Sequence, residues 1–273
     1  MLIALMMAML WAPMPYMGDA ALPGQVIDVV GDNYFFRAPS TIRPGLTTFR
    51  FSSPHGGHEL MVYRLDSGYT ASDLVKALAE DAPPHGRKLG GPAFPRIGGS
   101  MNATYVLDPG QYVLLCFSTE RGDTLRHFQK GMFSALTVVG RRVAGRLPAP
   151  DLEISLDEYH FTFSRPLVAG RHVMRVANTG NATHELKFLR VLPGHTTEQS
   201  INWKRGEPPV DEQFGAITSV DPGMSIITTM DFPPGDYVVI CVLQTRKGHV
   251  MREGLHVTAR MNSRSRMPAG TTS

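Results

Sequence analysis

The sequence predicts an all-β protein made of two tandem β-sandwich domains, and three observations support this prediction. The chain has 27 glycines and 21 prolines, and the apolar runs between these turn-forming residues are short, as strands are. One order of motifs occurs twice along the chain. Of the 273 residues, 42% are hydrophobic and only 19% are charged, so the chain can bury a core in each domain.

The repeat is visible in three pairs of residues at nearly constant spacing: Tyr34 and Tyr159, His58 and His184, Cys116 and Cys241. The tyrosines and the cysteines are 125 residues apart and the histidines 126 apart, which indicates duplication. We therefore predict domains at residues 24–140 and 151–261. A Gly, Pro and Arg-containing linker joins them at 141–150, and a mobile polar tail follows at 262–273.

Each copy contains short strand-like segments, and one helix is expected in the first copy. Strands are expected at residues 26–30, 47–51, 60–65, 112–117 and 135–139, and at residues 152–154, 172–177, 186–192, 237–243 and 255–259. Pro-Gly turns at 109–110 and 234–235 precede the strands that carry the cysteines. A short helix is expected after Thr70 or Ser72, with Leu74, Val75 and Leu78 on its apolar face. Residues 196–203 occupy the matching place in the second copy.

Residues 1–20 predict export to the periplasm or the cell exterior. The first seventeen residues carry no charge, residues 2–11 are almost wholly apolar, and small residues follow near Ala20, as in a secretory signal. No Lys or Arg precedes the apolar run, so a short buried helix is the alternative. Ten apolar residues are too few to span a bilayer, and no other segment reaches that length. We expect no membrane span after export.

The charge balance excludes one class of partner. Lys and Arg number 27 and Asp and Glu 24, a formal net charge of +3. A nucleic-acid-binding domain usually carries a much stronger basic patch, so no nucleic-acid partner is expected.

The two cysteines occupy the same position in their own copies, each at the end of an apolar strand. A disulfide needs Cα atoms within about 7 Å, and equivalent core positions of two separate sandwiches rarely approach so closely. A Cys116–Cys241 bond is therefore not expected. Buried, unreactive thiols remain an alternative.

Each cysteine is accompanied by histidines and a methionine. The candidate ligands are His58, Cys116, His127 and Met132 in the first copy and His184, Cys241 and His249 in the second. Two imidazoles, a thiolate and a weak axial thioether form the ligand set of a blue-copper electron-transfer site. His55 is a rival ligand three residues before His58. Glu59 and Glu185, next to the upstream histidines, either orient a ring or face solvent.

With these residues the chain resembles the cupredoxin family, the plastocyanin- and azurin-like blue-copper proteins, in tandem. The resemblance covers residues 24–261 and rests on the Pro-Gly-x-Tyr-x-x-x-Cys strand, the histidines on either side and the His-x4-Met spacing of the first copy. It implies a Greek-key sandwich and a copper site near the loop end of each copy, contact between the two domains, and a redox partner protein. The loop between cysteine and histidine is longer than is usual in the family.

The second copy departs from this pattern. Aligning Gly131-Met132 with Gly254-Leu255 puts Leu255 in the axial position, whereas Met251 lies only two residues after His249. The resemblance thus implies one copper in the first copy and leaves a second copper open. With leucine in the axial position, the second site would be the more oxidising.

Three functions follow from the sequence. The main expectation is type 1 copper electron transfer or copper holding, by a carrier rather than a catalyst. The first alternative is a metal-free cupredoxin-like interaction module. The second is a nitrite-reductase-like copper enzyme with a site between the domains. The chain contains no His-x-His pair, which argues against an oxidase.

Overall fold

A computed structural model describes residues 21–204, 206–243 and 250–260. The predicted export segment at 1–20 and the predicted tail at 262–273 lie outside the described residues. The described chain is built mainly from strands that form two sheets, so the all-β prediction is confirmed. The proposed domain limits stay a prediction, and we refer to residues 24–140 and 151–261 as the first and second repeats.

The first sheet has eight strands. In spatial order they are β11 (Phe161–Phe163), β10 (Leu152–Leu156), β12 (Gly170–Asn178), β15 (Ser225–Phe232), β7 (Ser100–Leu107), β4 (Gly45–Ser52), β1 (Gln25–Asp32) and β2 (Phe35–Arg37). The first four strands belong to the second repeat and the last four to the first repeat.

The second sheet has nine strands. In spatial order they are β17 (Met251–Val257), β16 (Gly235–Cys241), β13 (His184–Val191), β14 (Asp211–Val220), β6 (Gly86–Ala93), β5 (Met61–Leu65), β8 (Gly110–Leu115), β9 (Phe133–Val138) and β3 (Thr41–Ile42). Strands β8 and β16, which lead into the cysteines, begin at Gly110 and Gly235, as the Pro-Gly turns predict.

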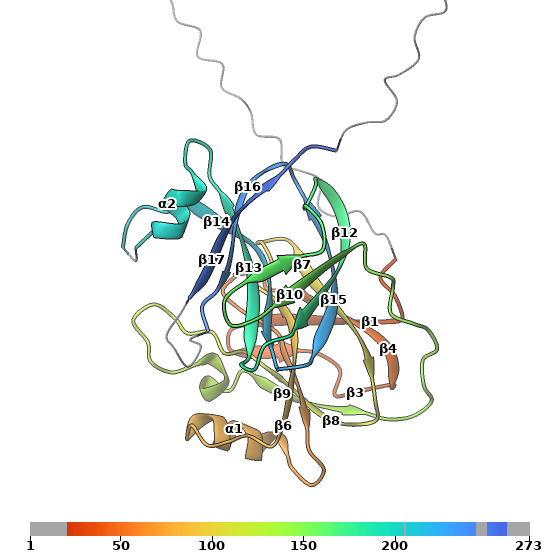
Figure 1. The fold of residues 1–273 in the computed structure, drawn as a ribbon. Coiled ribbons are helices and arrows are strands. Elements are labelled where there is room, and N and C mark those ends of the chain that lie inside the picture. The colour runs from red at the N-terminus through yellow and green to blue at the C-terminus, as the bar shows by residue number, and fades with distance from the viewer. Residues whose placement is uncertain (1–20, 205, 244–249, 261–273) are drawn as a thin grey trace, which may run out of the picture.

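The strand orders are mirror-related about the junction between the repeats, because each strand of the first repeat except the edge strand β3 has its counterpart at the equivalent place on the other side. Such an arrangement is that of two similar units related by an approximate two-fold axis. In Figure 1 the second repeat lies above the first. The two predicted sandwiches therefore meet edge to edge and share both sheets.

Two strand pairs join the repeats. In the second sheet β6 pairs with β14 from Ala216↔Ala93 to Val220↔Leu89. In the first sheet β7 meets β15 at Ile227↔Thr104. There the Asn102 amide donates to the Thr229 carbonyl over 2.8 Å, and its oxygen accepts from the Thr229 N–H over 3.0 Å. Without this pairing, the N–H and C=O groups of β6, β7, β14 and β15 would form open sheet edges. Each repeat thus supplies hydrogen-bond partners for the edge strands of the other repeat.

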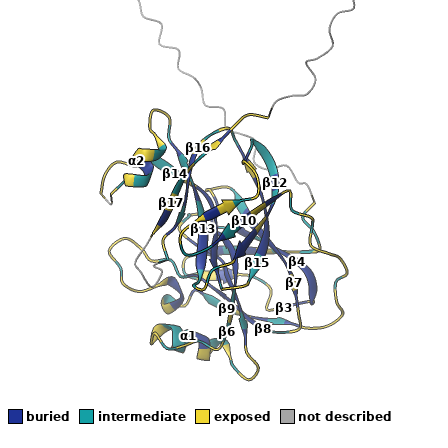
Figure 2. Ribbon diagram, in the orientation of Figure 1, coloured by how far each residue is buried: buried dark blue, intermediate teal, exposed yellow. Residues whose placement is uncertain are grey.

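The main core lies between the two sheets and runs through both repeats. Its largest buried side chains include Phe49, Phe51, Tyr112, Phe232 and Tyr237. The strands are buried on their inner faces, whereas the loops are exposed (Figure 2). Tyr112 and Tyr237 also donate through their hydroxyls to the carbonyls of Asp108 and Pro233, over 2.9 and 3.0 Å. This repeated contact fixes the start of each cysteine-bearing strand.

The helix expected in the first repeat forms, and a second helix forms at the matching place in the second repeat. Helix α1 (Ala71–Ala79) begins after Thr70, whose side chain accepts from the Asp73 N–H and so caps the helix. Leu74 is its buried apolar residue. Helix α2 (Thr197–Asn202) begins after Thr196 with the same type of cap, formed with Gln199. A one-turn 3-10 helix, η1 (His127–Lys130), follows the first cysteine.

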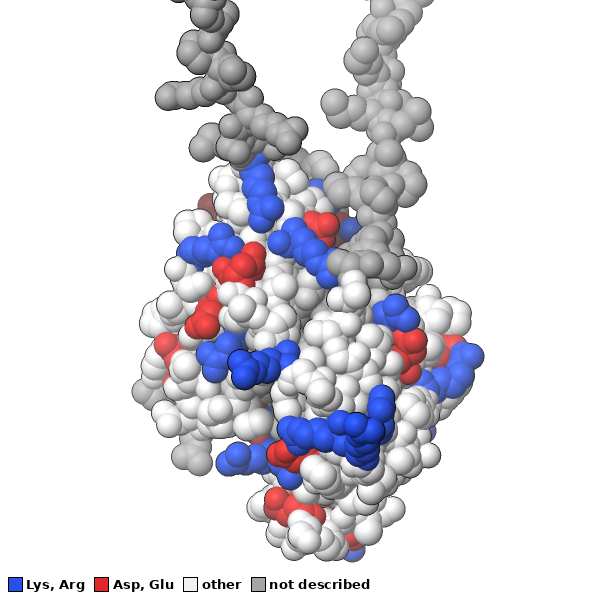
Figure 3. Space-filling model, turned by 90° about the vertical axis from the view of Figure 1, so that its right-hand side faces the viewer, with Lys and Arg blue, Asp and Glu red and all other residues white. Residues whose placement is uncertain are grey.

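The surface agrees with the charge balance. Basic and acidic side chains are interspersed on the face shown in Figure 3. Within the described residues, no helix has the length and apolar character needed to cross a bilayer.

Candidate metal centre

Both cysteines are buried at the ends of equivalent strands. Cys116 directly follows β8 and is fully buried, and Cys241 is the last residue of β16 and 1% exposed. Both are free thiols, so the expectation that no bond joins them is confirmed.

The chain after Cys116 folds back so that His127 returns to the cysteine. The His127 N–H donates to the Ser118 carbonyl over 2.8 Å, and the Phe128 N–H donates to the Cys116 carbonyl over 2.9 Å. His127 is the first residue of η1, and His58 lies just before β5, beside the end of β8. The central pairing of β5 with β8 thus brings residues far apart in sequence to one end of the first repeat.

Three side chains of the first repeat converge. The Nδ1 atoms of His58 and His127 are 3.0 Å apart, and they lie 3.8 and 3.5 Å from the Cys116 sulfur. A point inside this triangle is about 2.0 Å from all three atoms, near the roughly 2.0–2.3 Å at which nitrogen and sulfur ligands hold zinc, a comparable ion. These three residues form the group within the described chain that could hold a metal ion.

The donor set also fits a metal electrostatically. All three residues are buried, at 8%, 0% and 3% exposure for His58, Cys116 and His127. Burial lowers the pKa of both histidines, so their ring nitrogens are neutral donors near neutral pH. Burial raises the pKa of the Cys116 thiol to about 12. A metal must therefore displace the thiol proton, as in thiolate sites generally.

Met132 lies on the strand ladder opposite Cys116. The Cys116 N–H donates to the Met132 carbonyl over 3.2 Å, and the Met132 N–H donates to the His127 carbonyl over 2.9 Å. The Met132 side chain is fully buried. Its methyl group lies 3.0 Å from the place where a Cβ on Gly31 would be, so the glycine makes room for it.

The second repeat places His184 and Cys241 in the same relation. The Nδ1 atom of His184 lies 3.8 Å from the Cys241 sulfur, the distance found between His58 and Cys116. His184 is fully buried, and burial lowers its pKa while raising that of Cys241. The predicted third ligand, His249, lies outside the described residues.

The strand register corrects the predicted axial position of the second repeat. On the β16–β17 ladder Cys241 is opposite Met251, whereas Leu255 is opposite Tyr237, four residues further along. Met251 is therefore the counterpart of Met132, and the assignment of Leu255 is wrong. The sequence alignment failed because the hairpin from cysteine to methionine spans 16 residue steps in the first repeat and 10 in the second. The argument for a more oxidising second site loses its basis.

The two glutamates are buried rather than facing solvent, a feature that the sequence left undecided. Glu59 accepts from the Phe117 N–H over 2.9 Å, and Glu185 accepts from the Val242 N–H over 3.1 Å. Each carboxylate therefore bonds the residue after the cysteine of its own repeat. Burial, and next the charge of nearby Glu185, raise the pKa of Glu59.

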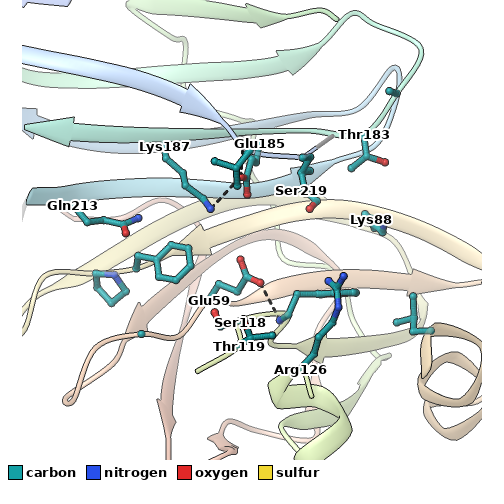
Figure 4. A pocket seen from close by; sticks show the side chains of 18 of the residues that line it. Glu59, Lys88, Ser118, Thr119, Arg126, Thr183, Glu185, Lys187, Gln213 and Ser219 are labelled. Atoms are coloured by element: carbon teal, nitrogen blue, oxygen red, sulfur yellow. Dashed lines mark hydrogen bonds and ion pairs between the residues drawn. The ribbon is translucent and has the colours of Figure 1, made fainter. Parts of the chain in front are cut away.

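These glutamates also lie at the junction of the repeats. Glu59 accepts from the Thr218 hydroxyl over 3.0 Å, a bond from the first repeat to the second. Lys187 lies 3.0 Å from Glu185 and neutralises it. Both carboxylates line a cleft of about 1230 Å³, with Arg126 on the opposite wall from Lys187 (Figure 4).

The other histidines among the described residues do not join the cluster of His58, Cys116 and His127. His55 bonds Asp32 over 2.8 Å and is exposed, so it is not a rival to His58. The buried His172 is satisfied by Asp151 and the Val168 carbonyl. His85 stacks on Tyr69, and His256 bonds Asp236. These contacts assign them structural or surface roles.

Comparison with known proteins gives structural neighbours only. No family model matches the sequence, and no curated protein matches it. The chain is similar to dithionite-reduced auracyanin from Roseiflexus castenholzii, with 20% identity over 42% of this chain and 98% of that one and a TM-score of 0.27.

Two further solved structures are similar over both repeats. A copper-containing nitrite reductase from Thermus scotoductus shares 14% identity over 86% of this chain and 61% of its own, with a TM-score of 0.23. A blue copper oxidase from Nitrosomonas europaea shares 9% identity over 86% and 85%, also with a TM-score of 0.23.

Proposed function

We propose that this chain, whose fold is cupredoxin-like, binds copper at His58, Cys116 and His127 and transfers single electrons through that centre. The observation that carries the proposal is the convergence of two imidazole nitrogens and one thiol sulfur in a buried site. Two histidines and a cysteine with a weak axial thioether are the ligands of blue-copper electron-transfer sites. Bound there, copper supplies a one-electron couple.

The side chains around the site support this chemistry. Neutral His58 and His127 present their Nδ1 atoms to one point, and Cys116 offers a thiolate once its proton is displaced. The Phe117 N–H, held by Glu59, keeps the backbone after the cysteine fixed. A site held in one geometry needs little rearrangement when its charge changes. Burial of all three donors excludes bulk water.

Electron transfer is favoured over catalysis by the composition of the cleft between the repeats. A copper enzyme with a site there would need ligands for a second metal. Among the residues that line the described cleft there is no histidine and no cysteine. Its two deeply buried carboxylates are already paired with Thr218, Lys187 and backbone N–H groups.

The same proposal includes the cellular setting expected from residues 1–20. An exported carrier outside the cytosol would exchange electrons with a redox partner protein there. A protein that holds copper for delivery would use the same ligands as an electron carrier. The two functions differ in whether the copper is released.

The test is a redox cycle on purified protein loaded with Cu(II). We expect an intense visible thiolate-to-copper band that ascorbate abolishes and ferricyanide restores, with one electron per copper. A copper chelator at neutral pH distinguishes delivery, because a carrier keeps its copper through the cycle and a delivery protein releases it.

Two results would overturn the proposal. A protein that stays colourless and copper-free after loading is a metal-free interaction module. Sustained turnover of nitrite or of a phenol by the loaded protein would instead make it an enzyme.

A further inference from the structure

The hairpin turn before β2 has an unusual backbone. Strands β1 and β2 are joined by two residues, Asn33 and Tyr34, between the paired Asp32 and Phe35. Both turn residues have positive φ, 47° and 63°. Two-residue turns of this kind favour glycine at the second position, and a bulky residue there is a genuine outlier. A strained residue that is kept in place by its surroundings points to a function.

The surroundings of Tyr34 hold its ring against a candidate copper ligand. The ring meets the His127 imidazole edge-on, with centroids 5.0 Å apart and planes at 77°. The His127 ring also contacts the His58 ring, with centroids 4.9 Å apart. The His127 Nε2 atom is buried and has no hydrogen-bond partner. Packing alone therefore shields this nitrogen from solvent.

The Tyr34 hydroxyl is anchored to the loop that carries His127. It donates to Glu120, and Lys130 donates to it over 3.2 Å. The Lys130 ammonium also lies 4.6 Å from the centre of the Tyr34 ring and is held by Asp123 over 2.5 Å. The turn and the loop between Cys116 and Met132 are thus locked together around the tyrosine.

The turn of the second repeat differs from that of the first at the equivalent place. The register Gly31↔Phe36 matches Leu156↔Phe161, so Tyr159 is the counterpart of Tyr34. Its turn has four residues with negative φ, and Tyr159 is 52% exposed. There Glu158 lies 3.9 Å from the Nε2 atom of His184, the counterpart of His58.

We propose that Tyr34 is a positioning residue that closes the first centre, holding His127 in place and excluding small exogenous ligands such as azide. The closed centre exchanges electrons but not ligands. This inference rests on the proposed function for its meaning, since it concerns the specificity of the same site. The shielding of His127 is a property of the metal-free chain and is testable without copper.

The first experiment measures histidine reactivity in the metal-free protein. Diethyl pyrocarbonate modifies accessible imidazoles, and peptide mass spectrometry reports each histidine separately. In Tyr34→Gly, glycine keeps the positive φ without strain while the ring is lost. We expect His127 to react roughly tenfold faster in this variant than in the wild type. A good aromatic contact contributes up to about 1.5 kcal/mol, which corresponds to about a factor of ten.

Two variants serve as controls in the same assay. Tyr159→Gly makes the same change in the second repeat and should leave the His127 rate unchanged. Tyr34→Phe keeps the ring but removes the hydroxyl anchor, and should accelerate His127 less than Tyr34→Gly does. An unchanged His127 rate in Tyr34→Gly would overturn the shielding role whether or not the protein binds copper.

The second experiment titrates azide into the Cu(II)-loaded proteins. The wild type and Tyr159→Gly should keep their visible spectra, whereas Tyr34→Gly should gain a new azide-dependent band. An azide response of the wild type equal to that of Tyr34→Gly would contradict the inference. If no variant takes up copper, the proposed function fails, and the reactivity of His127 still decides the role of Tyr34.

Discussion

The two repeats keep the same strand ladders but differ in the loops that carry the candidate ligands. Cys116 directly follows β8 and Cys241 ends the equivalent strand β16, opposite Met132 and Met251. The hairpin between cysteine and methionine is six residues longer in the first repeat. In that repeat the longer loop forms η1 and brings His127 to within 3.5 Å of the cysteine sulfur. Backbone pairing therefore preserves the framework, while the loop of the first repeat supplies its third candidate ligand.

The largest effect is expected on copper binding, from matched changes of the upstream histidines. His58→Ala removes one of three converging donors, so copper affinity should fall by at least roughly 100-fold and the visible band should disappear. His184→Ala should leave the band of the first centre intact. Copper titration followed by absorption measures both variants. Equal losses in the two variants would mean that the repeats are not functionally different.

The corrected register predicts a difference in stability between two residues of β17. Met251 is 5% exposed beside Cys241, whereas Leu255 is only partly buried. Met251→Ala should lower the free energy of unfolding by about 2–5 kcal/mol through lost core packing. Leu255→Ala should cost clearly less. Urea denaturation of the metal-free variants measures both losses of unfolding free energy. A larger loss in Leu255→Ala than in Met251→Ala would contradict the corrected register.

The buried glutamates test the junction between the repeats. Glu59→Ala leaves the Phe117 N–H and the Thr218 hydroxyl without their acceptor, which should cost about 1–3 kcal/mol. Glu185→Ala leaves the Val242 N–H and the Lys187 ammonium unpaired, so we expect a cost of the same order. Thermal unfolding measures the loss of stability in each variant. A negligible loss in both would mean that the carboxylates do not hold the backbone after the cysteines.

The raised thiol pKa also predicts a pH dependence of the metal-free protein. Burial holds the folded-state pKa of Cys116 at about 12, above the unfolded value near 9. The folded state then keeps a proton that the unfolded state releases, so stability falls as pH rises above about 9. The slope is at most about 1.4 kcal/mol per pH unit for one thiol.

Serine variants isolate this contribution. Burial also raises the pKa of Cys241, so both Cys116→Ser and Cys241→Ser should flatten the loss of stability between pH 8 and 11. Parallel curves for the wild type and both variants would show that neither thiol has a raised pKa.

The sequence predicted the strands whose apolar runs face the core, and it did not predict those that join the repeats. Strands β6, β7, β14 and β15 were missed. β6 contains three glycines and a proline. The junction buries polar residues between its apolar ones and so interrupts the apolar runs. These residues are Asn102, Thr104, Thr218, Thr228 and Thr229. These residues pair with the other repeat, a partner that periodicity within one segment cannot reveal.

The candidate site could be predicted in part for a similar reason. Residue type and order identified His58, Cys116 and His127, because the required chemistry restricts the residues that can serve. The role of Glu59 depends on its bond to a backbone N–H 58 positions away, which no local pattern encodes. Met251 was considered and set aside in favour of Leu255, because the sequence of loops of unequal length does not give the strand register, whereas the hydrogen bonding between the strands does.

The central claim is that the first repeat holds the copper centre, and the visible spectra of two cysteine variants test it most directly. Cys116→Ser and Cys241→Ser make the same small change at equivalent positions, so each is the control for the other. After loading with Cu(II), we predict that Cys116→Ser lacks the thiolate-to-copper band of the first centre and that Cys241→Ser retains it. A full-strength band in Cys116→Ser, or its loss in Cys241→Ser alone, would contradict the account.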